Sequence, residues 1–320
     1  EHLAQNFRCK HSVNSNFVRV IMLDFSKYQG KRIKCAGLGE VLFDVLPTGA
    51  KFGGAPANLA FHCKQQGLEA MAISSVGKDA LGFKARDLLA CKFLPALLLE
   101  NDKQTGAVHV DLSADGVPTY TFLEDTAYDN IPLTPMLLET AKSLDMVCFG
   151  TLAQRNRSSH GTIMAFLDVM KEDALKVFDV NLRREYYSKE VIEDSLKRSD
   201  VFKCNEDELP ILSEIAGLKD SNADRFFEYL QNRGIDCFIF TEGAKESTVY
   251  LNDEKSLLPT PKVENVVDTV GAGDSFTATI ISSLMKGDPL VKAHEKAVNI
   301  AAYVCTQKGA MPEIPYNFIK

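Results

Sequence analysis

Two glycines, Gly271 and Gly273, and an aspartate, Asp274, precede an apolar helix predicted over 275–286. Glycines leave the backbone amides of 271–274 accessible, and the first amides of a helix, with its macrodipole, favour an anion. A carboxylate beside an anion is costly unless it takes a proton from a hydroxyl that attacks a bound phosphate. The alternative is a tight turn with a capping aspartate, so other residues must decide between the two.

Small and polar residues also gather near the start of the chain. Asp44 follows an apolar run and could accept hydrogen bonds from hydroxyl groups, or could be a solvated loop residue. Gly53 and Gly54 precede a helix with almost no side-chain bulk, which permits close approach of a small ligand. Asn58, in the first turn of that helix, can both donate and accept. Tight packing of the helix on a sheet would require the same small residues.

Further polar residues follow later strand-like runs. Arg183 could form two hydrogen bonds with phosphate oxygens. Asn205 and Glu208 lie one helical turn apart and could hold a hydrated Mg²⁺, although an acidic, capped helix start is the simpler alternative. Thr241 and Gly243 form another small loop after a strand.

Apolar runs alternate with helix-period segments from Arg32 onward, which predicts a doubly wound, mostly parallel α/β sheet with helices on both faces. Strands are expected at 33–38, 70–76, 145–149, 175–180, 200–203, 236–241 and 247–251. Helices are expected at 56–66, 80–91, 135–143, 159–171, 189–197, 206–215, 222–232, 275–286 and 290–303. Ligands bind outside the carboxyl ends of such strands, where the residues above are expected to meet.

One segment breaks the alternation. Residues 105–123 read as a β-hairpin with an Asp115-Gly116 turn. Inserted into a βαβ series, such a hairpin is expected off the main sheet, as a lid or a dimer surface, with the edge of the main sheet as the alternative.

Composition excludes several classes of protein. A net charge of −7 over 320 residues argues against a nucleic-acid-binding surface. No apolar run approaches 18 residues and no secretory signal is recognisable, so we expect no membrane span and a cytoplasmic location. Eight cysteines without a C-x-x-C pair favour buried thiols over zinc or disulfides. A dinucleotide fingerprint is incomplete, and neither a Walker A sequence nor a protein-kinase motif occurs.

These residues closely resemble the ribokinase-like (PfkB) family of carbohydrate kinases over about 33–315. Both family signatures are present, in the glycine-rich stretch from 53 to 82 and in the run 268–274. Within the family the chain looks most like a fructokinase, through the segments 39–44, 53–58, 127–131 and 179–183.

The resemblance assigns roles to the residues already singled out. Asp274 would be the general base, and the amides of Gly271, Ala272 and Gly273 the anion hole. The predicted substrate contacts are Asp44, Gly53, Gly54, Asn58 and Arg183. The predicted ATP contacts are Asn205, Thr241, Gly243 and Asn299. Asn299 lies one residue beyond Val298, the helix position at which many relatives carry Asn or His. Glu208 would organise Mg²⁺ through water, and a monovalent cation such as K⁺ would be held by Asp268, Val270, Val304 and Gly309.

The resemblance implies an ATP-dependent sugar kinase that phosphorylates a primary hydroxyl, with fructose as acceptor and fructose 6-phosphate as product. A kinase of the same fold acting on ribose, 2-keto-3-deoxygluconate or a nucleoside is the first alternative, and a non-catalytic sugar- or nucleotide-binding relative is the second. Residues 1–31 would be an extension of unknown role. Residues 32–320 would form the kinase domain, with a β lid from about 45–52 and 104–131 that could pair two subunits as a homodimer.

Overall fold

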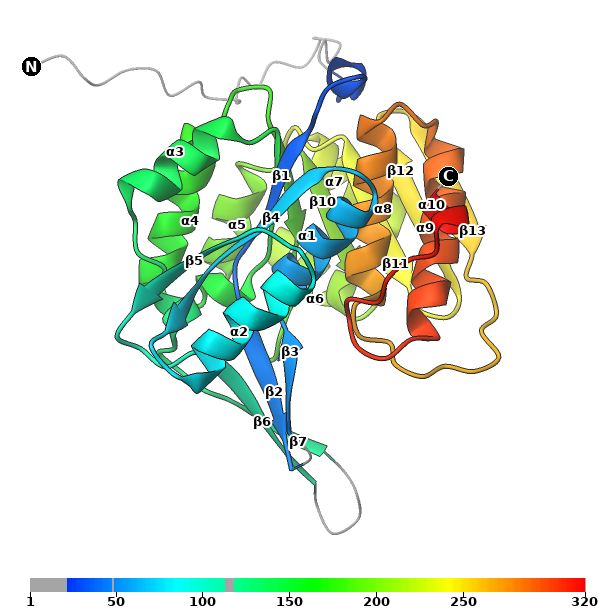
Figure 1. Ribbon diagram of the computed structural model, residues 1–320. Helices are drawn as coiled ribbons and strands as arrows, with labels where there is room; N and C mark the ends of the chain where they lie inside the picture. Colours follow the sequence, from blue (N-terminus) through cyan, green and yellow to red (C-terminus); the bar gives the residue numbers. More distant parts are fainter. Residues whose placement is uncertain (1–21, 48, 113–117, 320) are drawn as a thin grey trace, which may run out of the picture.

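A nine-stranded sheet forms the centre of the protein in a computed structural model that describes residues 22–47, 49–112 and 118–319 (Figure 1). Its strand order is β13-β12-β11-β10-β9-β8-β1-β4-β5. The strands are β1 (Lys34–Leu38), β4 (Glu69–Gly77), β5 (Ala96–Asn101), β8 (Met146–Phe149), β9 (Leu175–Asp179), β10 (Val201–Asn205), β11 (Cys237–Glu242), β12 (Glu246–Leu251) and β13 (Glu254–Pro259). All pairs from β5 to β11 are parallel, and only β12 and β13 pair antiparallel, so the predicted fold class is confirmed.

Helices cover both faces of this sheet. One face carries α1 (Ala55–Gln65), α2 (Ala80–Cys91), α8 (Ala272–Met285) and α9 (Leu290–Cys305). The other carries α3 (Pro135–Ser143), α4 (Arg157–Val169), α5 (Lys189–Leu196), α6 (Glu208–Ala216) and α7 (Ala223–Gln231). A short α10 (Tyr316–Ile319) and the 3₁₀ turns η1 (Ser26–Tyr28), η2 (Ala127–Asn130) and η3 (Leu152–Gln154) complete the fold. In the described part of the chain no helix combines the length and the apolar character that crossing a membrane requires.

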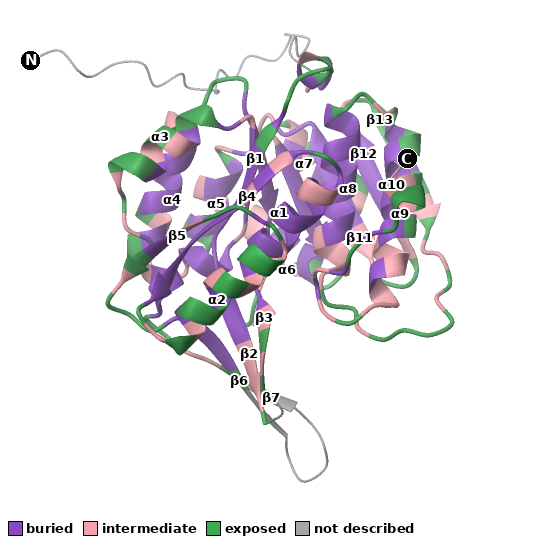
Figure 2. Cartoon of the chain, in the orientation of Figure 1, coloured by how far each residue is buried: buried purple, intermediate pink, exposed green. Residues whose placement is uncertain are grey.

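Alternation along the strands gives the two faces different chemistry. Cys148 and Val177 point toward α1 and α8, whereas their chain neighbours Phe149 and Phe178 point toward the α4–α7 face. The aromatic rings continue across neighbouring strands, with Phe149 and Phe178 stacked at 5.2 Å between centroids and Phe178 and Phe202 edge-on at 5.6 Å. The central strands are largely buried, as Figure 2 shows, and the apolar side chains on the two faces of the sheet form two separate cores.

The winding of the sheet reverses between β1 and β8. From β1 the chain proceeds through β4 and β5 to one edge, and from β8 it proceeds through β9, β10 and β11 to the other. When the connections from two neighbouring parallel strands lead to opposite sides of a sheet, a crevice forms at the carboxyl ends of those two strands. Gly39 and Glu40 follow β1, and Gly150 and Thr151 follow β8, so these residues border the crevice.

A second, four-stranded sheet has the order β3-β2-β6-β7. It consists of β2 (Leu42–Leu46), β3 (Gly49–Gly53), β6 (Gly106–Leu112) and β7 (Pro118–Phe122), and it projects from the body at the bottom of Figure 1. The predicted hairpin pairs antiparallel and lies off the main sheet, as expected. Its predicted Asp115-Gly116 turn lies outside the described residues. We call this sheet the lid.

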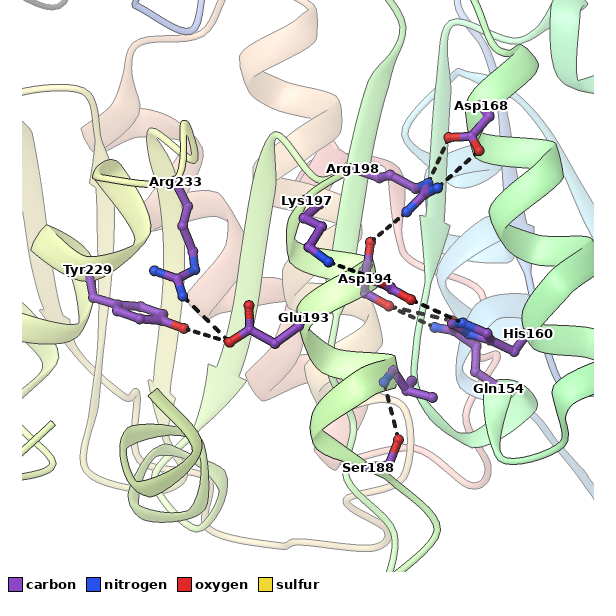
Figure 3. A network of polar contacts seen from close by, with 12 residues as sticks. Gln154, His160, Asp168, Ser188, Glu193, Asp194, Lys197, Arg198, Tyr229 and Arg233 are labelled. Atoms are coloured by element: carbon purple, nitrogen blue, oxygen red, sulfur yellow. Dashed lines mark hydrogen bonds and ion pairs between the residues drawn. The ribbon is translucent and has the colours of Figure 1, made fainter. Parts of the chain in front are cut away.

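Polar contacts hold α5 between α4 and α7 (Figure 3). Arg198, just after α5, donates to both carboxylate oxygens of Asp168 on α4, at 2.7 and 3.0 Å. Glu193 on α5 accepts from Arg233, beyond α7, at 3.5 Å. Gln154 donates to Ser195 of α5 at 3.1 Å and to the carbonyl of Gly150 at 2.8 Å, which links this layer to the crevice.

Four strands are absent from the strands expected individually, although the lid implied by the resemblance included 45–52, which overlaps β2 and β3. β2 and β3 are short and only partly buried, β5 is buried only at its centre, and β13 is mostly exposed at the sheet edge. Residues 22–31, assigned by the sequence to an extension, pack on the domain instead. Phe25 and Tyr28 are buried, and the Tyr28 hydroxyl donates to the carbonyl of Asp173 at 2.6 Å.

Candidate active site

The start of α8 has the geometry of an anion site. Gly271 has a φ of 82°, and an added Cβ would lie 2.6 Å from the carbonyl oxygen of Ala310, so only glycine fits. Its carbonyl accepts the amide of Ser275 at 2.8 Å as the helix begins, while no side chain caps the first turn. The amides of Ala272 and Gly273 therefore border a cleft without a side-chain cap.

Asp274 lies in this first turn and contacts α1. The side-chain amide of Asn58 donates to Asp274 Oδ2 at 2.8 Å. Burial, followed by the charge of Asp179, raises the pKa of Asp274 to about 6, against the opposing effects of Asn58, Lys203 and Arg183. The carboxylate is thus ionised at neutral pH and poised to accept a proton.

Asp44 lies in the lid rather than in the main domain. It pairs across β2 and β3 with Lys51 and is half-buried. Burial raises the pKa of Asp44, while the charges of Lys51 and Arg183 oppose that shift. Gly54 precedes α1 with a φ of 128°, and an added Cβ would lie 2.4 Å from the carbonyl oxygen of Glu40. Close backbone approach therefore requires glycine at position 54, whereas an added Cβ on Gly53 would closely approach only the side chain of Leu42, at 3.1 Å.

Arg183 lies in the loop after β9 and is exposed. Its positive charge partly offsets the rise in the pKa of Glu40, Asp44 and Asp274. The guanidinium group is therefore within electrostatic reach of both the lid and Asp274. The same loop contains Asn181 with a φ of 45°, a conformation uncommon for a residue with a side chain.

The sequence missed Glu40, the buried acid of the crevice. Its side chain is 3% exposed and its Oε2 atom has no hydrogen-bond partner. Burial raises the pKa of Glu40 to about 7. Together with Asp179 and Asp274 it lines a small cavity of about 10 Å³ behind the start of α1. Its position directly after a glycine at a strand end was the available signal.

The sequence also missed Lys203, which lies in β10 and is 7% exposed. Its Nζ atom is 3.0 Å from Oδ1 of Asp179. The other carboxylate oxygen of Asp179, Oδ2, accepts from the hydroxyl of Thr277 on α8 at 3.2 Å. A lone lysine inside an apolar strand was the only sign in the sequence.

A cleft of about 750 Å³ extends from the start of α8. Its lining includes the predicted residues Asn205, Thr241 and Gly243. Asn299 is not among the lining residues: it is exposed and donates back to the carbonyl of Glu295 at 2.8 Å, whereas Val298 lines the cleft. Successive residues of a helix point about 100° apart, so the two cannot share this wall.

Asn205 and Glu208 cap each other at the start of α6. Asn205 Oδ1 accepts from the amide of Glu208 at 2.9 Å, and Glu208 Oε2 accepts from the amide of Asn205 at 2.8 Å. Glu208 Oε1 accepts from Leu182 at 2.8 Å, and burial raises the pKa of Glu208. Glu208 does not line the cleft, whereas Glu206 and Asp207 do. The capping alternative therefore describes the observed contacts of Glu208, and Glu206 and Asp207 are the carboxylates of this turn that face the cleft.

The residues predicted for a monovalent cation come from the loop before α8, which holds Asp268 and Val270, from the last turn of α9, which holds Val304, and from the loop after α9, which holds Gly309. Asp268 accepts from Val270 at 3.1 Å and from Gly309 at 3.3 Å, and the carbonyl of Val304 accepts from Gln307 at 2.9 Å. The structure thus brings these residues together beside Gly271. Across the described residues no group of three or more His, Cys, Asp or Glu side chains is placed to hold a metal ion, so a cation here would depend on carbonyl oxygens or phosphates.

Comparisons with known proteins agree with this geometry. An ATP-dependent 6-phosphofructokinase of Thermoanaerobacterium thermosaccharolyticum is 29% identical over 318 residues, covering 94% of this chain and 95% of that protein. A fructokinase of Klebsiella pneumoniae is 29% identical over 303 residues, covering 88% and 95%. The crystal structure of an uncharacterized sugar kinase from Pyrococcus horikoshii superposes with a TM-score of 0.73 at 27% identity, covering 87% of this chain and 93% of that one.

The family itself follows from a profile match over nearly the whole chain. Residues 21–317 match the pfkB family of carbohydrate kinases, with Asp274, the start of α8 and the lid all inside that span. The chain belongs to the pfkB family of carbohydrate kinases and is a phosphotransferase that acts on a sugar hydroxyl.

Proposed function

We propose that the protein transfers the γ-phosphoryl group of ATP to the 6-hydroxyl of fructose. The observation that carries the proposal is the position of Asp274. It accepts a hydrogen bond from Asn58, a predicted sugar contact, and lies in the first turn of α8, whose first amides border the cleft that we assign to the nucleotide. An acceptor hydroxyl held beside Asp274 and Asn58 would face those amides across the transferred group.

In this mechanism Asp274 accepts the hydroxyl proton as the new bond to phosphorus forms. The transition state for phosphoryl transfer is loose, so a base with a pKa of about 6 is sufficient. The amides of Gly271, Ala272 and Gly273 stabilise the charge on the equatorial oxygens. Asp44 in the lid would hold the sugar, and closure of the lid would exclude water as a competing acceptor.

Mg²⁺ and K⁺ belong to the same proposal. Mg²⁺ bound to the phosphates would neutralise their charge, with Glu206 and Asp207 as carboxylates that line the cleft. Glu208, whose two carboxylate oxygens accept from the amides of Asn205 and Leu182, would act only through water. A monovalent cation beside Asp268, Val270, Val304 and Gly309 would fix the loop against which Gly271 packs.

Other acceptors compete with fructose. One relative is a 6-phosphofructokinase and another a fructokinase, so relatives of equal identity carry names with different acceptors. Ribose, 2-keto-3-deoxygluconate and nucleosides remain the alternatives within the fold. The intact Asp274 argues against the non-catalytic alternative.

The test is ADP release with ATP and Mg²⁺, with and without K⁺, over a panel of acceptors. The panel contains fructose, fructose 6-phosphate, ribose, 2-keto-3-deoxygluconate and nucleosides. We expect the highest kcat/KM with fructose and a product phosphorylated at O6. A higher kcat/KM with another acceptor would replace fructose, and no turnover with any acceptor would favour the non-catalytic alternative.

The lid also suggests how two subunits could associate. Strands β3 and β7 are the edges of the lid sheet, and an edge strand can pair with another chain. We propose a homodimer formed through the lid, acting on a free sugar and ATP in the cytoplasm. Sedimentation of the protein would show a monomer if the lid does not pair.

A further inference from the structure

Lys203 stands at the point where the sheet meets the start of α8. In β10, Val201 and Lys203 point to the α8 face while Phe202 points to the other, so the lysine extends toward the anion site. Its side chain is 9% exposed and lines the nucleotide cleft. The other cationic residue among the lining residues of this cleft is Lys262, which is exposed.

The ammonium group is close to the anion-binding backbone. An added Cβ on Gly273 would lie 3.6 Å from Lys203 Nζ, so the ammonium group sits beside the first turn of α8. An ammonium has three donors, and the ion pair with Asp179 at 3.0 Å leaves others for a second anion.

The charges nearby explain why a cation is needed here. Asp179, Asp274 and Glu208 all act electrostatically on Lys203. A phosphate that approaches Gly273 would meet these carboxylates, and the repulsion between like charges is strongest where burial lowers the effective dielectric constant. Lys203 is the buried cation placed between them and the amides.

We propose that Lys203 is a catalytic residue that contacts the transferred phosphoryl group directly, completing the anion hole of 271–273. This inference rests on the proposed assignment of the cleft to ATP. The competing explanation is that Lys203 only neutralises Asp179 and supports the fold.

A double substitution separates the two explanations. Lys203→Met leaves Asp179 buried without its partner, whereas Lys203→Met with Asp179→Asn removes both charges. If neutralisation of Asp179 were the only role, the double variant would recover most of the activity. We expect both variants to lose kcat by roughly 10²–10³-fold, as when one donor to the developing charge is removed. Recovery in the double variant would overturn the proposal.

Direct binding measurements supply a readout apart from turnover. By calorimetry, Lys203→Met should weaken the non-hydrolysable ATP analogue AMP-PNP about 10-fold or more, because a charge-assisted contact is lost, and weaken ADP, which lacks the γ-phosphate, much less. Lys203→Arg should restore part of the AMP-PNP affinity. Equal loss for both nucleotides would overturn the proposal, and so would unchanged affinity for AMP-PNP.

A matched control removes an ion pair far from the cleft. Arg198→Met breaks the pair with Asp168 on the opposite face of the sheet and should leave both nucleotide affinities unchanged. If wild-type protein bound neither nucleotide, the assignment of the cleft to ATP would fail, which is distinct from failure of the role of Lys203.

Discussion

Asp274 lies between a residue of the predicted sugar site and the first amides of α8. Asp274→Asn keeps the shape and the contact with Asn58 but removes the proton acceptor. We expect kcat to fall by roughly 10²–10⁴-fold, the usual contribution of a general base, while sugar and ATP affinities stay within a few-fold. Steady-state kinetics and calorimetry check this, and near-normal turnover would exclude Asp274 as the base.

The raised pKa of Asp274 also predicts a pH dependence. The base form exists above its pKa of about 6, so kcat/KM should fall as pH decreases below that value. Glu40, with a pKa of about 7, is mostly neutral there and adds little charge. A pH–rate profile with its acidic midpoint near 4 would show that Asp274 is solvated in the free enzyme.

The residues that the sequence located and those it missed differ in a physical way. Asp274 and Asn58 follow glycines or small residues at helix starts, a local pattern with a local cause. Lys203 and Glu40 are important because of what surrounds them. In the sequence, Lys203 is a single polar residue within a strand. Glu40 lines a cavity between the start of α1 and the end of β8, two elements that are distant in sequence. Such nonlocal burial leaves no pattern in a single sequence.

Among the elements, α1 connects the sugar side with the anion hole. Asn58 and His62 lie one turn apart, and His62 Nε2 donates to the Ala310 carbonyl at 2.9 Å. That oxygen lies against Gly271. Helix α1 therefore positions both Asp274, the proposed base, and Gly271, the residue that precedes α8.

His62→Leu removes this donor without changing either ligand site. We expect kcat to fall on the order of 10-fold with little change in sugar KM, because misplacement of about 1 Å at a reacting group can cost up to about 10²-fold. His62→Gln, which keeps a donor, should recover part of the loss.

Gln65 offers the matched control for His62. It binds the carbonyl of Pro312 at 3.0 Å and the amide of Ile314 at 2.7 Å, on the same loop but beyond Ala310. Gln65→Leu should lower the melting temperature with a smaller effect on kcat. Equal loss of kcat in both variants would mean that the loop as a whole, rather than the Ala310 carbonyl, positions Gly271.

In the main sheet, the strands that the sequence predicted are mostly those buried on both faces, where apolar runs are continuous. β2, β3, β5 and β13 escaped because they are short or exposed, so their side chains carry little hydrophobic pattern. The register of the lid depends on pairing β2 with β6, about 60 residues later, which no local rule specifies.

At the scale of the whole molecule, the lid and the main sheet are separate sheets that share the predicted sugar site. Asp44 comes from the lid and Asn58 from α1, so a bound sugar would bridge them. We expect fructose to slow amide hydrogen exchange in β2 and β3, and ATP alone to have little effect there. Exchange in the central strands should not change with either ligand. Protection of the lid by ATP alone would contradict the division of the site.

The alternation of the strands has a practical consequence for thiol chemistry. Cys35, Cys148, Cys204 and Cys237 are all sealed within the two cores, whereas Cys91 is exposed and Cys305 lines the nucleotide cleft at partial exposure. In a variant with Cys9 and Cys91 replaced by serine, a thiol reagent should modify Cys305 first, because it is more exposed than the buried cysteines. The reaction calls for mildly alkaline pH, because burial raises the pKa of Cys305. ATP should slow that reaction, and Cys305→Ser should abolish it. The rate at which Cys305 is modified would thus report whether the cleft is occupied. An unchanged rate with ATP would place the nucleotide elsewhere.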